Sequence, residues 1–296
     1  MTVRTLHYTA TAADEGKKLK HLLRGELQLS STLLKTLKWR EGAIMLNGES
    51  ARVDAVIHEG DRVSVTIDER DAREDDVKPL PLPLDIVYED EDLLVLNKPA
   101  GLAMHPKSTD LTAPHLAGAL VNYLGSGSVP HFVSRLDKGT SGLLIAAKSG
   151  YVHELLRRAL HTDALRREYL ALAVGTLPSE SGSIDLPIAR DESSLVKRCC
   201  REDGLPSLTE YKLLSQQNGL SLVHLIPHTG RTHQLRVHMA AIGCPLLGDW
   251  LYGTEEREKI TRPALHSAIL RFTHPLTGEE LSFEAPLPED MAKFVK

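Results

Sequence analysis

The stretch from residue 135 to residue 147 joins charged residues to an apolar run, and its residue types could carry out nucleophilic or acid–base chemistry. The letters RLD at 135–137 are followed by GTSG at 139–142 and by the apolar run 143–147. An ionised carboxylate can act as a nucleophile or as a base. In an extended segment Arg135 and Asp137 point to the same side. Either the two form a structural ion pair or Asp137 is held there for chemistry.

Two glycines flank the turn that follows Asp137. Glycine reaches backbone conformations that other residues rarely adopt, so we expect Gly139 and Gly142 to let the chain turn tightly around the acid. Residues 142–147 are predicted to form a buried strand. That strand would anchor the carboxylate at the edge of the core.

A second candidate is Tyr169, in the segment REYLALAVG at 167–175. On a strand, Tyr169 shares one face with Ala171 and Ala173, while leucine and valine side chains take the other face. Small residues beside a tyrosine leave room for a flat ligand against its ring. The alternative is a tyrosine on a thinly packed face of the core.

A third candidate is Arg231, in the segment HTGRTHQLRVH at 228–238. The pattern predicts a helix that begins close to Arg231 and stops at Gly243. A cation in the first turn of a helix is unfavourable for the helix dipole. We therefore expect an ionised carboxylate to compensate the charge of Arg231.

The histidines of this segment do not predict a metal site. His228, His233 and His238 are spaced five residues apart, and five residues rotate by about 140° around a helix, so they do not share a face. The sequence also lacks the HExxH zinc motif, the GxxxxGK[ST] phosphate loop and the GxSxG nucleophile elbow. Without these motifs, the sequence gives no support for nucleotide hydrolysis or for serine-hydrolase chemistry.

The elements that must position these residues lie between residue 84 and the end of the chain. Periodicity predicts two amphipathic helices and a series of strands joined by long irregular stretches: helices near 150–161 and 231–243, and strands near 85–99, 142–147, 167–175, 220–227, 264–272 and 280–286. This is not the regular alternation of a Rossmann layout. We predict an α/β (α+β) fold with a large mixed, mainly antiparallel sheet.

The N-terminal part, about 14–68, has the pattern of a second, small α/β unit. Leucines between residues 19 and 27 fall on one helical stripe, and Ser30 or Ser31 can cap a second helix. Asn47-Gly48 predicts a hairpin between short strands. The end of the second helix gathers three basic residues, Lys35, Lys38 and Arg40, which a helix C-terminus also favours for structural reasons.

The segment 69–83 divides the chain. It is first charged and then contains Pro79, Pro81 and Pro83, which is the composition of a linker. We therefore expect a small domain over 1–68, a linker over 69–83 and a large domain over 84–296.

Composition points to a cytoplasmic protein. No run approaches the roughly 18 apolar residues that span a membrane, and the N-terminus lacks the apolar core of a signal peptide. The three cysteines, Cys199, Cys200 and Cys244, do not form a CxxC pair. The net charge of −5 argues mildly against a nucleic-acid partner, but the basic residues are clustered, so a locally basic face is compatible with it.

Three long segments, in this order, resemble the sequence motifs of the RluA-type pseudouridine synthases. They are VSRLDKGTSGLLIAAKS, RREYLALAVG and HTGRTHQLRVHMAAIGCPLLGDWLYG, with further matches in LLVLNKPAGLAMHP upstream and LHSAILRFTHPLTGEELSFEAPLP downstream. The resemblance covers about 84–290. The N-terminal part resembles the S4-like RNA-binding domain, which presents basic residues of its second helix to structured RNA; here Lys35, Lys38 and Arg40 take that place.

The resemblance implies roles for individual residues. Asp137 matches the catalytic aspartate, Tyr169 the tyrosine that contacts the target base, and Arg231 an arginine paired with the aspartate. Arg135 matches the arginine that helps hold the flipped-out nucleotide. The family usually has histidine directly before RLD, where this chain has Ser134.

The implied activity is the isomerisation of uridine to pseudouridine in RNA, most simply in 23S ribosomal RNA, with transfer RNA as the alternative. The reaction needs neither cofactor nor metal, and we expect a monomer whose partner is RNA and not a membrane. A rival of another class is a non-catalytic RNA-binding or ribosome-assembly protein, which would require Asp137, Tyr169 or Arg231 to be missing. A glycosidase is disfavoured because that chemistry typically needs two convergent carboxylates, and the motifs carry Asp137 alone.

Overall fold

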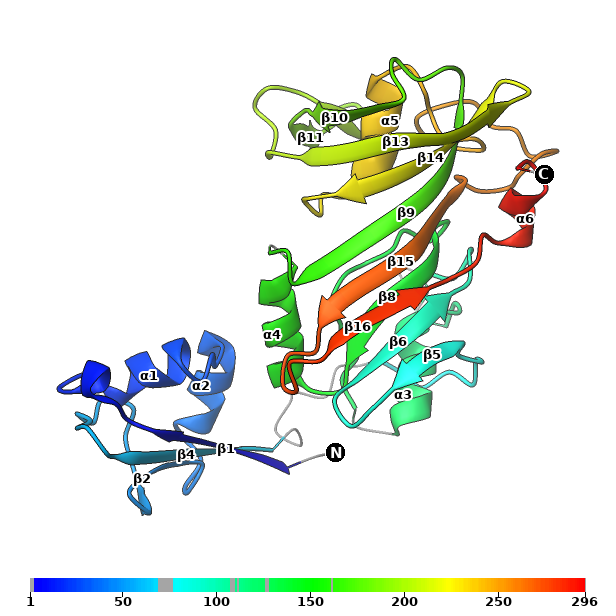
Figure 1. The fold of residues 1–296 in the computed structure, drawn as a ribbon. Coiled ribbons are helices and arrows are strands. Elements are labelled where there is room, and N and C mark those ends of the chain that lie inside the picture. The colour runs from blue at the N-terminus through cyan, green and yellow to red at the C-terminus, as the bar shows by residue number, and fades with distance from the viewer. Residues whose placement is uncertain are drawn as a thin grey trace.

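The computed structural model describes residues 3–68, 77–106, 110, 112–125, 128–160 and 162–295. Most of the expected linker, 69–76, lies outside these residues. Figure 1 shows two groups of elements, a small one that contains the N-terminus and a larger one built around a long twisted sheet.

The small group combines two helices with a four-stranded sheet. Its helices are α1 (Leu19–Gly25) and α2 (Ser31–Leu37), and its strands, in sheet order, are β1 (Val3–Thr9), β4 (Arg62–Asp68), β2 (Ile44–Leu46) and β3 (Glu49–Ser50). The backbone N–H of Leu33 donates to the Ser30 hydroxyl, which confirms Ser30 as the helix cap. Asn47 and Gly48 both have positive φ in the turn of the β2–β3 hairpin, as that turn requires.

The large sheet confirms the predicted fold class. In order, eight of its ten strands are β10 (Ser181–Asp185), β13 (Leu208–Gln217), β14 (Leu220–Pro227), β9 (Leu165–Val174), β15 (Leu265–Thr273), β8 (Ser141–Ala147), β6 (Leu93–Lys98) and β5 (Ile86–Glu89). The strand β16 (Glu280–Glu284) pairs with β15, and β7 (His131–Phe132) pairs with β8. Among the described strands, β15 and β8 run parallel and the other pairs of this sheet run antiparallel.

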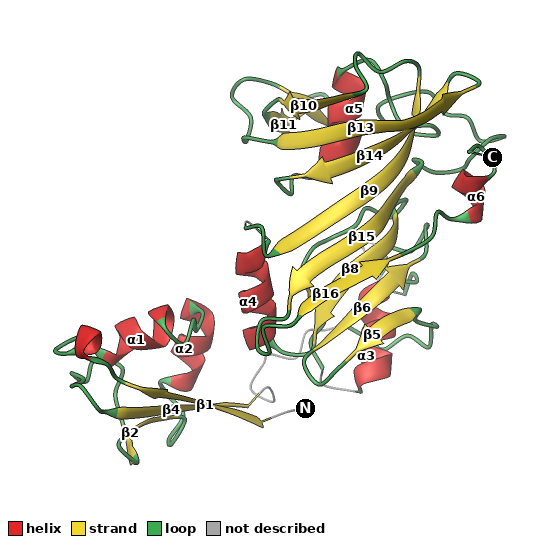
Figure 2. Cartoon of the chain, viewed as in Figure 1, coloured by secondary structure: helices red, strands yellow, loops and turns green. Residues whose placement is uncertain are grey.

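Strand β8 is buried on both faces because helices cover the sheet on both sides. Leu144 and Ala146 belong to a core shared with α3 (Leu116–Leu124) and α5 (Gln234–Ala241). Leu143, Ile145 and Ala147 point the other way, into a core shared with α4 (Gly150–Ala159). Figure 2 shows the helices and the long strands. The continuous apolar run of β8 therefore fits a central strand.

Helix α4 also contacts the small group. The ring of Tyr151 belongs to the apolar core formed by α1, α2 and their sheet, and its hydroxyl donates to the Leu27 carbonyl over 3.2 Å. Arg4 of β1 forms an ion pair with Asp92, next to β6. Two independent contacts thus join the small group to the large sheet.

The remaining elements are short. A 3-10 turn spans Ala12–Asp14, the hairpin of β11 (Ile188–Arg190) and β12 (Arg198–Cys200) packs beside α5, and α6 (Glu289–Ala292) lies near the C-terminus. Among the described residues, no helix combines the length and the apolar character needed to cross a membrane.

Candidate active site

Asp137 lies in the turn between β7 and β8, where the backbone is fixed by its neighbours. The Thr140 N–H donates to the Asp137 carbonyl over 3.0 Å and closes the turn. Gly142 has φ +109, and a Cβ there would lie 2.2 Å from the Ser267 carbonyl oxygen of β15. Gly139 has no positive φ, and a Cβ there would meet the Pro263 ring at 3.0 Å. Both glycines are therefore required by the close approach of the segment 262–267. Gly142 is required also by its positive φ, as expected of a glycine in a turn, whereas Gly139 is not.

A buried lysine, Lys98, stabilises the turn that carries Asp137. Lys98, at the end of β6, is 1% exposed, and its ammonium donates to the carbonyls of Pro99, Leu102 and Lys138 at 2.8, 3.0 and 3.3 Å. Burial lowers the pKa of Lys98 to about 8, although the nearby Asp137 acts in the opposite direction. Because Lys138 directly follows Asp137, this ammonium fixes the backbone that carries the carboxylate.

A buried arginine, Arg262, also stabilises this turn. Arg262 donates through Nη1 to the Gly139 carbonyl at 3.1 Å and to the Leu265 carbonyl at 3.0 Å. Its Nε and Nη2 donate to the two carboxylate oxygens of Asp290, on α6, at 2.6 and 2.8 Å. The turn is thereby tied to the end of the chain as well as to the sheet.

The ionic partner of Asp137 is Arg236, in the first turn of α5. Arg236 Nη1 lies 3.3 Å from Asp137 Oδ2. Its Nε and Nη2 form a two-pronged pair with Asp249, each at 2.7 Å, and Asp249 is fully buried. No described residue donates to Asp137 Oδ1, and the Asp137 side chain is about one-third exposed (32%), so this oxygen is free of protein hydrogen bonds within the described chain.

The predicted pairing of Asp137 with Arg231 is wrong. Helix α5 begins at Gln234, so Arg231 precedes it, and its exposed guanidinium donates through Nε to the Pro206 carbonyl at 3.3 Å. The Arg231 N–H donates instead to the Gln234 side chain. The signal we missed is Arg236 itself, because an arginine inside the buried run 234–239 requires a buried anion.

Tyr169 lies two strands away from the turn. It pairs with Ser267 of β15, which in turn pairs with Gly142 of β8, and its side chain is 5% exposed. Ala171 and Ala173 are fully buried in the same core cluster as Tyr169. They are covered by protein, so the open space that we expected over the two alanines is not present among the described residues.

Arg135 is exposed on the turn, and within the described part of the chain no ion pair joins it to Asp137. The structural ion pair that the sequence left open as an alternative is therefore not present. The guanidinium faces solvent two residues from the carboxylate.

Two further side chains at the site were not predicted as functional. His233 Nε2 lies 3.9 Å from Asp137 Oδ2, and His233 Nδ1 lies 2.8 Å from the hydroxyl of Tyr252. The Arg236 guanidinium lies 5.1 Å from the Tyr252 ring centroid, a cation–π distance. The sequence spacing gave no reason to connect residues 233 and 252, because Tyr252 follows an irregular stretch.

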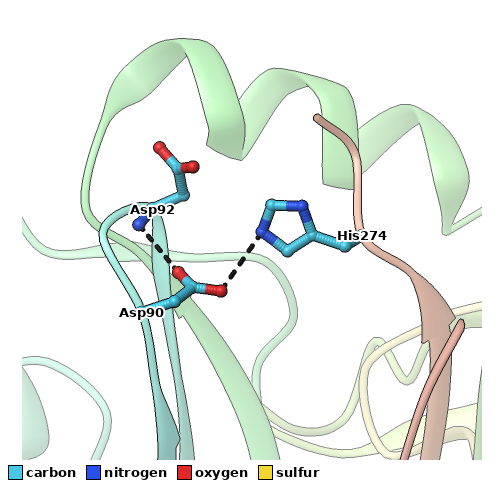
Figure 3. A group of neighbouring side chains, drawn as sticks. All are labelled: Asp90, Asp92 and His274. Atoms are coloured by element: carbon cyan, nitrogen blue, oxygen red, sulfur yellow. Dashed lines mark hydrogen bonds and ion pairs between the residues drawn. The ribbon is translucent and has the colours of Figure 1, made fainter. Parts of the chain in front are cut away.

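A cluster of Asp90, Asp92 and His274, shown in Figure 3, has the residue types of a metal site. His274 Nδ1 accepts from the N–H groups of Leu276 and Thr277, so a neutral imidazole carries its proton on Nε2, which faces Asp90 at 3.2 Å. Asp90 accepts three hydrogen bonds from other groups, and Asp92 pairs with Arg4. Protein groups thus account for this cluster as a connection between β1 and the large sheet.

Comparison with known proteins identifies the family of this chain. The sequence model of the RNA pseudouridylate synthase family matches residues 92–241, which include Asp137, Tyr169 and all of α5. The chain belongs to this family. Its members are isomerases that convert uridine in RNA to pseudouridine, and the chain is therefore a pseudouridine synthase.

Similar proteins cover nearly the whole synthase. An uncharacterized RNA pseudouridine synthase of Bacillus subtilis, YlyB, is 40% identical over 97% of this chain and 96% of its own length. Ribosomal large subunit pseudouridine synthase D of Pasteurella multocida is 35% identical over 90% and 86%. The solved structure of human RNA pseudouridylate synthase domain containing 1 superposes with a TM-score of 0.57 at 30% identity, over 69% of this chain and 83% of the human chain.

Proposed function

We propose that this synthase isomerises uridine in the 23S RNA of the large ribosomal subunit, with Asp137 as the catalytic carboxylate. One observation supports Asp137 as the catalytic carboxylate: its two oxygens differ in their contacts. Arg236 binds Oδ2, and Oδ1 has no donor among the described residues. The substrate part is supported by the large-subunit synthases D, 35–36% identical over 85–90% of the chain.

The chemistry requires an ionised acid. The C1′–N1 bond of uridine breaks, the base turns, and C5 bonds to C1′ while the C5 proton leaves and N1 gains one. Both routes that start from Asp137, attack on C1′ and removal of the 2′ proton, need its carboxylate form. Arg236 places its guanidinium 3.3 Å from Oδ2 of this carboxylate, and we assign to Arg236 the role that the sequence had suggested for Arg231.

The target nucleotide must leave its stack to reach Asp137, which costs a few kcal/mol. We assign the flipped base to the ring of Tyr169 and the flanking backbone to the exposed Arg135. Stacking and phosphate contacts offset the cost of flipping.

Deletion of the gene tests the substrate. We expect one or more pseudouridines to disappear from 23S RNA and to return when the wild-type gene, but not a gene carrying Asp137→Asn, is restored. The measurement is pseudouridine mapping of total RNA at single-nucleotide resolution. Loss of a pseudouridine from a transfer RNA, with 23S RNA unchanged, would replace the ribosomal assignment by the transfer-RNA alternative.

We further propose that the N-terminal unit is the S4-like RNA-binding domain, docked through Tyr151. Lys35 and Lys38 are exposed at the end of α2, and Trp39 beside them is 83% exposed with the Lys38 ammonium 4.7 Å from its ring centroid. An exposed aromatic ring beside cations is suited to unpaired bases and phosphates. Arg40 differs, because it is bound to the buried Asp68 at 3.0 Å and has a structural role.

The double variant Lys35→Ala/Lys38→Ala should therefore weaken RNA binding about 5- to 50-fold and lower the slope of log K against log salt by about 1 to 2. The measurement is a salt titration of binding to 23S RNA fragments. The control is Lys18→Ala/Lys20→Ala at α1, which removes the same charge elsewhere in the unit. Equal effects of the two double variants would show that net charge matters and the α2 face does not.

A further inference from the structure

His233 has a backbone conformation that calls for an explanation. Its φ of +60 lies in the left-handed region, where non-glycine residues are uncommon and usually held by their surroundings. The other non-glycine residues with positive φ in the described chain are Gln28, Asn47 and Asn218, and asparagine is a type common in turns. His233 is the one that lies within 4 Å of Asp137.

A chain of hydrogen bonds fixes which ring nitrogen of His233 carries the proton. The Arg198 N–H donates to the Tyr252 hydroxyl oxygen at 2.9 Å. The hydroxyl hydrogen is then free to donate to His233 Nδ1, at 2.8 Å. Burial raises the pKa of Tyr252 to about 12, so the phenol keeps that hydrogen. The proton of a neutral imidazole is thereby placed on Nε2, on the side of Asp137.

The enclosure of the His233 ring favours its neutral form. Burial lowers the pKa of His233 from its ordinary value, and Arg236 and Arg198 act in the same direction, while Asp137 and Asp249 oppose them. A neutral ring with Nδ1 accepting and Nε2 donating is a directional donor and not a counterion.

We propose that His233 is a positioning residue for Asp137: its Nε2–H, oriented by Tyr252, shares Oδ2 with Arg236 and thereby directs Oδ1 at the substrate. Nε2 lies 3.9 Å from Oδ2, and a side-chain shift of about 1 Å brings it to hydrogen-bond distance. Arg236 donates to Oδ2 through Nη1, and this single contact would leave the carboxylate free to rotate about the Cβ–Cγ bond. A second donor on the same oxygen fixes that rotation, which is the requirement for a near-attack geometry. This inference rests on Asp137 being the catalytic carboxylate.

Two substitutions separate the ring from the backbone. Asparagine tolerates positive φ and suits the left-handed cap, but its amide is too short to reach Asp137. Glutamine places an amide N–H close to the position of His Nε2. If the side chain positions Asp137, His233→Gln should retain activity that His233→Asn loses; if the backbone alone matters, the order is reversed.

The assay is single-turnover release of tritium from RNA labelled with [5-³H]uridine, because bond formation at C5 expels the C5 hydrogen. The RNA is total RNA from cells that lack the gene. We expect His233→Asn to lower the maximal rate constant about 10- to 100-fold and His233→Gln to stay within about fivefold of wild type, with RNA affinity unchanged in both. Full activity of His233→Asn, or equal losses in the two variants, would overturn the proposal.

Tyr252→Phe supplies an independent arm. It removes the hydroxyl that orients the imidazole but keeps the ring beside Arg236. We expect a loss of about 5- to 20-fold in the wild-type background and no further loss in His233→Asn, because the two residues act as one unit. Additive losses would contradict the chain from Tyr252 through His233. If instead Asp137 were not the catalytic carboxylate, the result would differ: the wild type would release no tritium, or Asp137→Asn would release it normally.

Discussion

Asp137→Asn should lower pseudouridine formation by about 10⁴-fold or more while the protein still folds and binds RNA. Asparagine has the size of aspartate but cannot serve as an anionic nucleophile or base. The Asp137 side chain is about one-third exposed, so losing its pair with Arg236 should change the free energy of unfolding by less than about 1 kcal/mol. The measurements are single-turnover isomerisation, RNA affinity and urea unfolding on one preparation.

The matched control for this variant is Asp163→Asn. It removes an exposed carboxylate that pairs with Arg166 of β9. We expect wild-type turnover from it. Appreciable isomerisation by Asp137→Asn would remove Asp137 from the reaction, and loss of RNA binding together with turnover would make its role structural.

Arg236→Met should have the largest effect on stability. It leaves the fully buried Asp249 without its two-pronged partner, and breaking a buried pair from one side costs about 3–5 kcal/mol. Turnover should also be lost, because Asp137 loses the guanidinium that binds its Oδ2. Urea unfolding and the isomerisation assay measure the two effects separately.

Two comparisons sharpen this prediction. Arg231→Met changes an exposed arginine in the same motif and should alter the unfolding free energy by no more than about 0.5 kcal/mol. The double variant Arg236→Met/Asp249→Asn removes both buried charges and keeps an acceptor for the Leu251 and Tyr252 N–H groups. It should regain most of the stability without regaining activity. If Arg231→Met proved the more damaging change, the ion pair seen here would not be the functional one.

The large sheet was predictable where the pattern of apolar residues was strong. The all-apolar run of β8, the helix α4 and the Asn47-Gly48 hairpin are all present as predicted. Each depends on interactions between residues close in sequence, or on burial that the residue types themselves record.

The elements that were missed lack such a signal. Strand β13 alternates weakly and carries many exposed polar residues, and it is held in the sheet by its neighbours β10 and β14. Strand β1 forms by pairing with β4, more than fifty residues later in the chain. Pairing partners so distant in sequence leave no local pattern.

The site shows the same limit. Asp137 was singled out because its turn and strand are local in sequence. Its partner was assigned to the wrong arginine because the helix was expected to begin close to Arg231 and begins at Gln234. Arg231 therefore lies outside the helix, and Arg236 in its first turn is the arginine that contacts Asp137. Tyr252 and Asp249 reach the site through an irregular stretch whose path only the tertiary structure determines.

The most direct test of the central claim is a crystal structure of the Asp137→Asn protein bound to an RNA that carries its target uridine. We predict a flipped uridine whose C1′ faces the side-chain atom of residue 137 that points away from Arg236, with the asparagine oxygen accepting from Arg236 and the ring of Tyr169 against the base. A uridine bound with its C1′ remote from residue 137, or Arg236 placed between that residue and the ribose, would contradict it.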